Sequence, residues 1–288
     1  MNFKELNLSA EMLRAIDVIG HSQATQIQQN AIPFILEGFD IIGCAQTGTG
    51  KTGAFTIPIL ERLNKSKKSS GNSIKALVLA PTRELAIQID ESFKMYNKFL
   101  GLKHTAIFGG VSAVNQIEIL NKGVDILTAT PGRLLDFIKQ GHVNVSQINV
   151  LVLDEADHML DMGFIHDMKK ILKFLPIKRQ TLFFSATMPE ETKKFSSTIL
   201  NHPKEVYVAP ISSTAKTVEQ KLYYVDKIEK PTLLIEILKD VKSQSLVFTR
   251  TKHGADKLVK RLLKVGIKTA AIHGNKSQGN RQRVLSDF

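Results

Sequence analysis

Apolar and polar positions follow two regular patterns along most of the chain. Short runs of Val, Ile and Leu between polar residues predict β-strands, and the stretches between them carry apolar residues at helical spacing. Leu85, Ile89, Phe93, Tyr96 and Leu100, for example, recur at steps of three and four and predict a helix face that packs in a core. In the first part of the chain, strands are predicted at residues 40–44, 76–80, 104–108, 126–130, 150–154, 180–184 and 205–208.

Repeated strand–helix units predict an α/β fold with a parallel sheet that is covered by helices on both faces. In such sheets, ligands bind at the carboxyl ends of the strands. Several polar segments directly follow predicted strands, and we expect them on this one edge: residues 45–52, 81–83, 130–133 and 154–155.

A break in composition after residue 208 predicts the domain organisation. Residues 209–217 read as a linker between a first domain, residues 1–208, and a second one, residues 218–288. The second part contains predicted strands at 218–225, 245–248 and 268–272, and helical patterns at 233–238, 255–263 and 278–288. About seventy residues are too few for a closed parallel sheet of this kind, so we expect the chain to end inside its second domain.

Composition narrows the class of protein. The 288 residues are 43% hydrophobic and carry a net charge of +12, which suits a globular protein that binds polyanions but also one that is merely rich in lysine. A single cysteine, Cys44, excludes an intramolecular disulfide framework, and we expect a packed thiol. No stretch has the pattern of a signal peptide or a membrane span, so a cytoplasmic protein is expected. Separately, the polar composition of residues 65–73 predicts a surface loop.

A glycine-rich segment after the first predicted strand is the strongest candidate for a ligand site. It reads Ala45, Gln46, Thr47, Gly48, Thr49, Gly50, Lys51, Thr52 and precedes a helical pattern. The two glycines let backbone N–H groups turn toward phosphate oxygens, Lys51 can reach the β- and γ-phosphates, and the Thr52 hydroxyl can ligate Mg²⁺. The usual pattern opens with Gly rather than Ala45, and a chance loop is the alternative.

Three carboxylates follow the apolar strand at residues 150–153. Asp154 can hold Mg²⁺ beside the phosphate loop, usually through water, and Glu155 can orient and deprotonate an attacking water. Surface clusters of acidic residues are common, but this one follows a buried strand downstream of a phosphate loop. Asp157, the third carboxylate, can accept hydrogen bonds from Ser185 and Thr187 and transmit the nucleotide state, although a simple helix cap explains those hydroxyls equally well.

Other strand ends carry groups that suit phosphate contact. These are Pro81, Thr82 and Arg83, then Gly109 and Gly110, then Thr130, Pro131, Gly132 and Arg133. Proline and glycine turns that begin helices expose backbone N–H groups to phosphate. A helix cap at Thr82, a salt bridge at Arg83 and a plain tight turn at Gly109–Gly110 are the alternatives.

Together these segments resemble the DEAD-box family of ATP-dependent RNA helicases. The tetrad Asp154-Glu155-Ala156-Asp157 is the one that names the family, and the order of the other segments agrees with it over essentially the whole chain. The resemblance implies a RecA-like P-loop NTPase domain followed by a second, incomplete RecA-like domain. It implies ATP and Mg²⁺ as cofactors and RNA as the partner, bound through backbone and 2′-OH contacts with little base specificity. It also implies closure of the two domains by ATP and RNA.

The family places an adenine-reading segment upstream of the phosphate loop, here within residues 1–29. Thr25 and Gln28 match its pattern, whereas both of its prolines and its aromatic residue are replaced in residues 20–28. The resemblance implies that the Gln28 amide reads the adenine edge and that Phe3 stacks on the base. RNA-processing or ribosome-assembly proteins are the protein partners that it suggests, with no membrane association.

In the second part, residues 247–251 resemble the family's next segment, so that Thr249 and Arg250 are expected to contact RNA backbone. Residues 273–281 resemble the family segment that follows it. Two later segments, one of which supplies arginine fingers, are not in the sequence, so weak turnover is expected of this chain by itself. An ATP- and RNA-binding module with little turnover is therefore the alternative to a helicase. A third hypothesis is a DNA translocase on the same scaffold. The Asp154–Asp157 tetrad, together with Thr25 and Gln28, disfavours it.

Overall fold

The computed structural model describes residues 2–66, 73–208, 219–241 and 243–288. By its internal contacts, the chain divides into two units, Met1–Ser212 and Ser213–Phe288. The predicted linker at residues 209–217, and most of the predicted surface loop at 65–73, lie outside the described residues.

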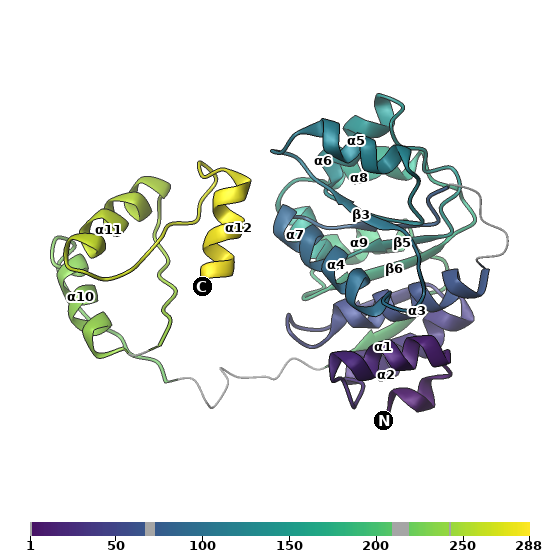
Figure 1. The fold of residues 1–288 in the computed structure, drawn as a ribbon, viewed down its shortest axis with the longest axis horizontal. Coiled ribbons are helices and arrows are strands. Elements are labelled where there is room, and N and C mark those ends of the chain that lie inside the picture. Colours follow the sequence, from purple (N-terminus) through teal and green to yellow (C-terminus); the bar gives the residue numbers. More distant parts are fainter. Residues whose placement is uncertain (1, 67–72, 209–218, 242) are drawn as a thin grey trace. The chain divides into compact units, whose positions relative to one another are not determined.

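The first unit is built on a seven-stranded parallel sheet (Figure 1). All seven predicted strands of this part are present. They are β1 (Ile41–Cys44), β2 (Ala76–Leu79), β3 (His104–Ile107), β4 (Ile126–Ala129), β5 (Val150–Leu153), β6 (Gln180–Ser185) and β7 (Lys204–Tyr207). Their order across the sheet is β3-β4-β2-β5-β6-β1-β7, and every recorded strand pair is parallel.

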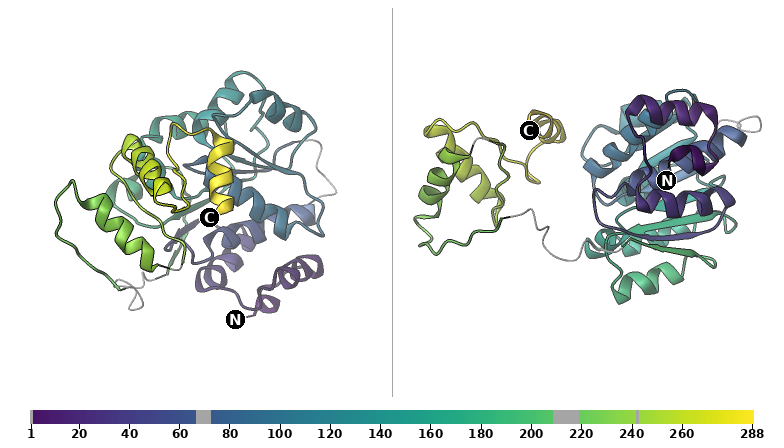
Figure 2. Two further views of the ribbon diagram at one scale, coloured as in Figure 1. Left: turned by 60° about the vertical axis from the view of Figure 1, so that its left-hand side comes forward. Right: turned by 90° about the horizontal axis from the view of Figure 1, so that it is seen from below.

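Helices cover both faces of this sheet, as the view from below makes visible (Figure 2). On one face lie η1 (Phe3–Leu6), α1 (Ala10–Ile19), α2 (Gln26–Glu37), α3 (Lys51–Ser66) and α4 (Arg83–Tyr96). On the other lie α5 (Ala113–Asn121), α6 (Pro131–Lys139), α7 (Ala156–Asp161), α8 (Ile165–Leu172) and α9 (Glu190–Ser197).

The alternation of side chains along each strand divides the core into two halves. In β5, Val150 and Val152 pack with the cluster under α1–α4, while Leu151 and Leu153 pack with the cluster under α5–α9. All four are at most 2% exposed. Burial on both faces explains why the strands read as continuous apolar runs.

The strand order gathers the chemistry-bearing loops into two groups along that edge. The adjacent strands β5, β6 and β1 lead into the Asp154–Asp157 segment, the Ser185–Thr187 segment and the glycine-rich loop. The adjacent strands β3, β4 and β2 lead into Gly109–Gly110, Thr130–Arg133 and Pro81–Arg83. Residues far apart in sequence therefore meet because neighbouring strands end side by side.

The second unit contains α10 (Lys230–Asp240), α11 (Lys252–Lys264) and α12 (Gln278–Asp287), which agree with the predicted helical patterns. The predicted strands at 218–225, 245–248 and 268–272 are wrong, because the described residues of this unit form no strand. Strand propensity stabilises a strand only through hydrogen bonds and side-chain pairs with a neighbour. Without such a ladder, Tyr224 and Phe248 remain 93% and 87% exposed.

Among the described residues, none of the helices is both long enough and apolar enough to cross a lipid bilayer.

Candidate functional site

The glycine-rich loop lies where β1 ends, next to the end of β6. The Ala45 N–H donates a hydrogen bond to Ser185 O at 3.1 Å, and Ala45 itself is buried. Gly48 and Gly50 have φ angles of 83° and 91°, in the left-handed region that glycine adopts without strain. The loop ends at Lys51, the first residue of α3, so that a helix N-terminus faces the space above the loop.

The side chains of this loop leave its outer face open. Gln46, Thr47 and Gly48 are exposed, and the Thr49 hydroxyl turns back to donate a hydrogen bond to Gln46 O at 2.6 Å. Thr52 is half-buried in the first turn of α3. An exposed backbone turn with a helix N-terminus behind it has the geometry that binds phosphate.

Lys51 is the most unusual residue of the site. Its side chain is buried, with 7% of the residue exposed, and its Nζ atom has no hydrogen-bond partner in the part of the chain that the structure describes. A buried ammonium group without a partner is costly to the fold. An anionic ligand at the loop would satisfy it, and a triphosphate meets that requirement.

Asp154 lies 2% exposed at the end of β5, within electrostatic reach of Lys51. Burial raises the pKa of its carboxyl to about 6, with the Lys51 charge acting to lower it and the Glu155 charge to raise it. The Glu155 N–H donates a hydrogen bond to Asp154 Oδ1 at 3.0 Å, which also favours the ionised form. A bound divalent cation would compensate this buried charge as Lys51 does.

The described residues contain no cluster of three or more His, Cys, Asp or Glu side chains that could hold a metal by themselves. Such a set is not needed for Mg²⁺, which typically binds one or two carboxylates and takes its other ligands from water and substrate phosphates. Asp154, directly after β5, and Thr52, in the first turn of α3, carry oxygen atoms of the kind that this mode of binding uses.

Glu155 adopts φ 50° and ψ 50°, a left-handed conformation that is uncommon for a residue other than glycine. The conformation marks a strained backbone at the candidate site. His158, one turn along in α7, places Nδ1 3.4 Å from Glu155 Oε2. His158 was not predicted from the sequence as a site residue, although its spacing of three residues from Glu155 in a helix puts the two side chains on one face.

Asp157 is tied to the loop after β6. Its Oδ2 atom accepts hydrogen bonds from the Thr187 hydroxyl at 2.6 Å and from the Thr187 N–H at 2.9 Å. The Ser185 hydroxyl accepts from the Asp157 N–H at 3.3 Å and donates to Thr187 O at 2.7 Å. Burial raises the pKa of Asp157, but the hydrogen bonds that its carboxylate accepts, above all from Thr187, outweigh burial and leave the pKa below its usual value.

The segment expected to read adenine packs directly on the phosphate loop. Gln28, 5% exposed, accepts a hydrogen bond from the Thr25 N–H at 3.0 Å and donates one from Nε2 to Gly50 O at 3.1 Å. Both ends of the amide are thus engaged, one with the start of α2 and the other with the loop. A methyl group on Gly50 would come within 2.7 Å of Thr25 Oγ1, so a glycine is required at this contact.

Gly53 supports the same contact and was missed by the sequence analysis. A Cβ atom at this position would lie 2.6 Å from Gln28 Nε2. The signal was present in the sequence, because a glycine in the first turn of a helix is unfavourable and usually has a packing reason.

Phe3 does not lie on the surface of the candidate site. It is 2% exposed and packs in the core cluster under α1–α4. Its stacking on a base therefore remains a prediction, and it would require the ring to leave this cluster.

The second group of loops gathers arginine side chains around one turn. The Arg83 guanidinium lies against Gly110, where a methyl group would overlap it. Arg133 Nη2 donates to Val111 O at 3.3 Å, and its guanidinium carbon lies 5.0 Å from the centre of the Phe137 ring. Arg133 Nη1 is buried without a hydrogen-bond partner among the described residues, which suits a phosphate contact.

Helix caps contribute to the same segments. Thr82 caps α4 by accepting a hydrogen bond from the Leu85 N–H at 3.2 Å, with Pro81 buried behind it. Thr130 is the N-cap residue of α6 and Pro131 its first residue, and an added methyl on the exposed Gly132 would have no neighbour within 4 Å. The helix cap explains the conformation of Thr82 without any contact to RNA. The caps at Thr82 and Thr130 also place two helix N-termini at the carboxyl ends of the strands.

Thr249 and Arg250 belong to the second unit, which the structure describes by itself. Both are exposed and precede α11, whose first turn Thr251 caps by accepting from the Gly254 N–H at 3.0 Å.

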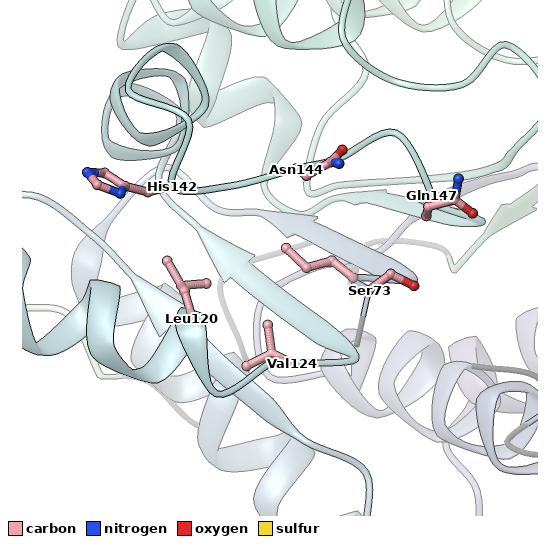
Figure 3. A pocket seen from close by; sticks show the side chains of 8 residues that line it. Ser73, Leu120, Val124, His142, Asn144 and Gln147 are labelled. Atoms are coloured by element: carbon pink, nitrogen blue, oxygen red, sulfur yellow. The ribbon is translucent and has the colours of Figure 1, made fainter. Parts of the chain in front are cut away.

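A hollow of about 190 Å³ lies at the other edge of the sheet (Figure 3). The apolar residues Ile74, Leu120 and Val124 line it. Asn144 and Gln147, which are exposed, line it as well. These residues precede or flank the amino ends of β2, β4 and β5, opposite the loops described above. The hollow is therefore separate from the candidate phosphate site.

Comparison with known proteins agrees with this geometry. Residues 25–195 match the DEAD/DEAH box helicase family, and residues 229–288 match the helicase conserved C-terminal domain. The whole chain is 42% identical over 293 aligned residues to the DEAD-box ATP-dependent RNA helicase CshA of Streptococcus pneumoniae, and 39% identical over 289 to the DEAD-box ATP-dependent RNA helicase RhpA of Helicobacter pylori. It spans 54% and 58% of their lengths.

Among solved structures, the chain is similar to a DEAD box protein from the hyperthermophile Methanococcus jannaschii. The TM-score is 0.68 at 38% identity, and the match covers 99% of this chain and 76% of that one. This similarity extends to the RecA-like arrangement of the parallel sheet.

Proposed function

The chain belongs to the DEAD/DEAH box helicase family, and from this membership we propose that it supplies the ATP-binding part of an ATP-dependent RNA helicase. The observation that carries the proposal is the buried, unpartnered Lys51 Nζ within electrostatic reach of the buried Asp154 carboxylate. A triphosphate with its magnesium ion would compensate both groups at once.

ATP binds, in this proposal, on the glycine-rich loop. Backbone N–H groups of the loop and the start of α3 donate to phosphate oxygens, and Lys51 pairs with the β- and γ-phosphates. Gln28 and Thr25 recognise the adenine edge, which needs one donor and one acceptor. The contact between Gln28 and Gly50 supports this assignment, because it joins the base-reading segment to the phosphate-binding loop.

Asp154 and Thr52 hold the magnesium ion, which supplies neutralisation of the charge that develops on the phosphates. Glu155 orients the attacking water and accepts its proton. The strained φ of Glu155 supports this role, since strained conformations are retained where they position a functional group. Asp157, Ser185 and Thr187 link this segment to the loop after β6.

RNA binds along the β3-β4-β2 group of loops, through Arg83, Arg133 and the helix N-termini at Thr82 and Thr130. Such contacts go to phosphate and sugar and carry little base specificity. Thr249 and Arg250 of the second unit are proposed to contact the same RNA. The net charge of +12 supports a polyanionic partner. A cytoplasmic location and RNA-processing or ribosome-assembly partners complete the proposal.

The test is ATP hydrolysis by the 288-residue chain with and without single-stranded RNA, and with DNA of equal length as the control. Stimulation by RNA and not by DNA, lost in Lys51→Ala, is the expected result. Binding of ATP and RNA without stimulated hydrolysis would instead favour a binding module with little turnover. Equal stimulation by both nucleic acids would contradict the assignment to RNA.

A further inference from the structure

The turn after β3 contacts two arginine side chains from different helices. Arg83, from the start of α4, lies against Gly110, and Arg133, from the first turn of α6, donates to the carbonyl of Val111 at 3.3 Å. Gly110 and Val111 are consecutive, so one short turn contacts both guanidinium groups. These contacts are between protein groups. Phosphate contact and a plain tight turn were the two interpretations of Gly109–Gly110 from the sequence, and direct contact with RNA stays a prediction.

The space that Gly110 leaves is filled by the end of the Arg83 side chain. A Cβ atom at Gly110 would overlap the guanidinium, with Arg83 Nη2 at 2.5 Å. At the neighbouring Gly109 the same atom would lie 3.8 Å from Arg83 Nη2, an ordinary contact. Of these two neighbouring positions, only position 110 therefore needs a glycine to leave room for Arg83.

We propose that Gly110 is a positioning residue, which leaves room for the Arg83 guanidinium to lie where it can pair with an RNA phosphate. The inference rests on the proposed function, because it concerns how this site holds its ligand. An arginine pairs with phosphate through a planar fork of donors, so its orientation matters as well as its charge. Displacing the guanidinium by a methyl group would lose that pairing while the charge remains.

The atom that a methyl group would meet is the end of a flexible side chain, and Gly110 is itself exposed. Gly110→Ala should therefore move Arg83 and leave the fold intact. Gly110 also has φ 77°, a conformation that strains any other residue. A control must separate this strain from the overlap.

Gly141, just after α6, provides that control. It has the same φ of 77°, and an added methyl group would have no neighbour within 4 Å. Gly141→Ala therefore places a side chain at the same positive φ in the same unit without touching an arginine. Thermal unfolding of both variants checks that they lose similar stability.

The experiment measures binding of a fluorescent oligouridylate to the full chain by anisotropy, over a range of salt concentrations. Losing one phosphate contact on single-stranded RNA should lower the slope of log K against log salt by about 0.7, which corresponds to about fivefold weaker binding at 0.1 M salt. We expect this change in Arg83→Ala and in Gly110→Ala, no further change in the double variant, and no change in Gly141→Ala.

Non-additivity is the result that distinguishes positioning from direct contact. If Gly110→Ala weakened binding by the same factor with and without Arg83, the turn would contact RNA itself and the inference would be overturned. It would also be overturned if Arg83→Ala weakened binding and Gly110→Ala did not. Absence of RNA binding by the unaltered chain would overturn the proposed function, and the inference with it.

Discussion

Gln28 Nε2 donates a hydrogen bond to Gly50 O at 3.1 Å, and this bond ties the start of α2 to the phosphate-binding loop. The other end of the same amide accepts from the Thr25 N–H. In the proposed function, Gln28 therefore has two roles: it recognises the adenine base, and it stabilises the conformation of the phosphate-binding loop. A change that displaces Gln28 should weaken nucleotide binding even if the loop is intact.

Gly53→Ala is predicted to weaken ATP binding. The added Cβ atom would lie 2.6 Å from Gln28 Nε2, so the amide must move away from Gly50. Losing one neutral hydrogen bond costs about 1 kcal/mol, or about a fivefold rise in the Kd for ATP. Titration with a fluorescent ATP analogue in the absence of RNA measures the change.

Gly132→Ala is the matched control for this measurement. It places the same methyl group in the first turn of α6, where it meets nothing within 4 Å. The Kd for ATP should be unchanged in this variant. An equal Kd in Gly53→Ala and the unaltered chain would contradict the proposed role of Gln28.

Asp154→Asn is predicted to stabilise the nucleotide-free chain at neutral pH. Burial raises the pKa of Asp154 to about 6, so the folded state keeps this proton to higher pH than the unfolded chain does. The stability that the protonated carboxyl contributes is complete below about pH 4 and is lost as the pH rises through about 6. At pH 7.5 the amide should therefore raise the free energy of unfolding by up to about 3 kcal/mol.

Thermal unfolding in EDTA at pH 4 and at pH 7.5 tests this prediction. Asp154→Asn should raise the midpoint of thermal unfolding at pH 7.5 and leave it unchanged at pH 4. Asp161→Asn makes the same chemical change at an exposed position at the end of α7, and it should shift neither midpoint. A gain of equal size at both pH values would show that ionisation of Asp154 is not its cause.

The first unit could be predicted from the sequence almost completely, because burial on both faces of the sheet leaves an unambiguous pattern. In β2 and β5, each residue is apolar and each is buried, so the strands stand out from the helical stretches. The second unit could not be predicted in the same way. Residues 245–248 carry the composition of a strand, but pairing with a neighbour is not encoded in a single segment.

The candidate site was partly visible as well. Loops that follow adjacent strands were expected to meet at one edge, and the strand order brings Ala45 beside Ser185 as that argument requires. The packing at Gly53 and at Gly110 could not be foreseen, because it depends on which side chain arrives from another element. The burial of Phe3 had the same origin, since an isolated aromatic residue carries no periodic signal.

Glu155→Gln is predicted to retain ATP binding and to lose most of its turnover. The amide keeps the shape of the side chain but cannot accept the proton of the attacking water. General-base catalysis contributes typically about 100-fold or more, so kcat should fall by at least about that factor while the Kd for ATP changes little. Single-turnover hydrolysis beside nucleotide titration separates the two effects.

Asp161→Asn again serves as the control, because it removes an acidic side chain from the far end of α7, the helix that Glu155 precedes. It should hydrolyse ATP at the rate of the unaltered chain. Turnover by Glu155→Gln within a few-fold of that rate would remove Glu155 as the water-activating group.

Thr187→Val is predicted to lower stability and to uncouple RNA binding from ATP hydrolysis. It removes the 2.6 Å hydrogen bond to Asp157 Oδ2 but keeps the size of the side chain. The cost should be about 1 kcal/mol, because the acceptor is charged but partly exposed to solvent. Thr187→Ser keeps the hydroxyl and is the matched control.

The pH dependence of this cost follows from Asp157. Burial raises its pKa, but the hydrogen bonds that the carboxylate accepts, above all from Thr187, outweigh burial and lower the pKa in the folded state. The stability that they contribute is present above the unfolded pKa of about 4 and is lost as the pH falls through the folded value. The difference between Thr187→Val and Thr187→Ser in free energy of unfolding should therefore be larger at pH 7 than at pH 3. If RNA stimulated ATP hydrolysis equally in both variants, the bond would be structural and would carry no coupling.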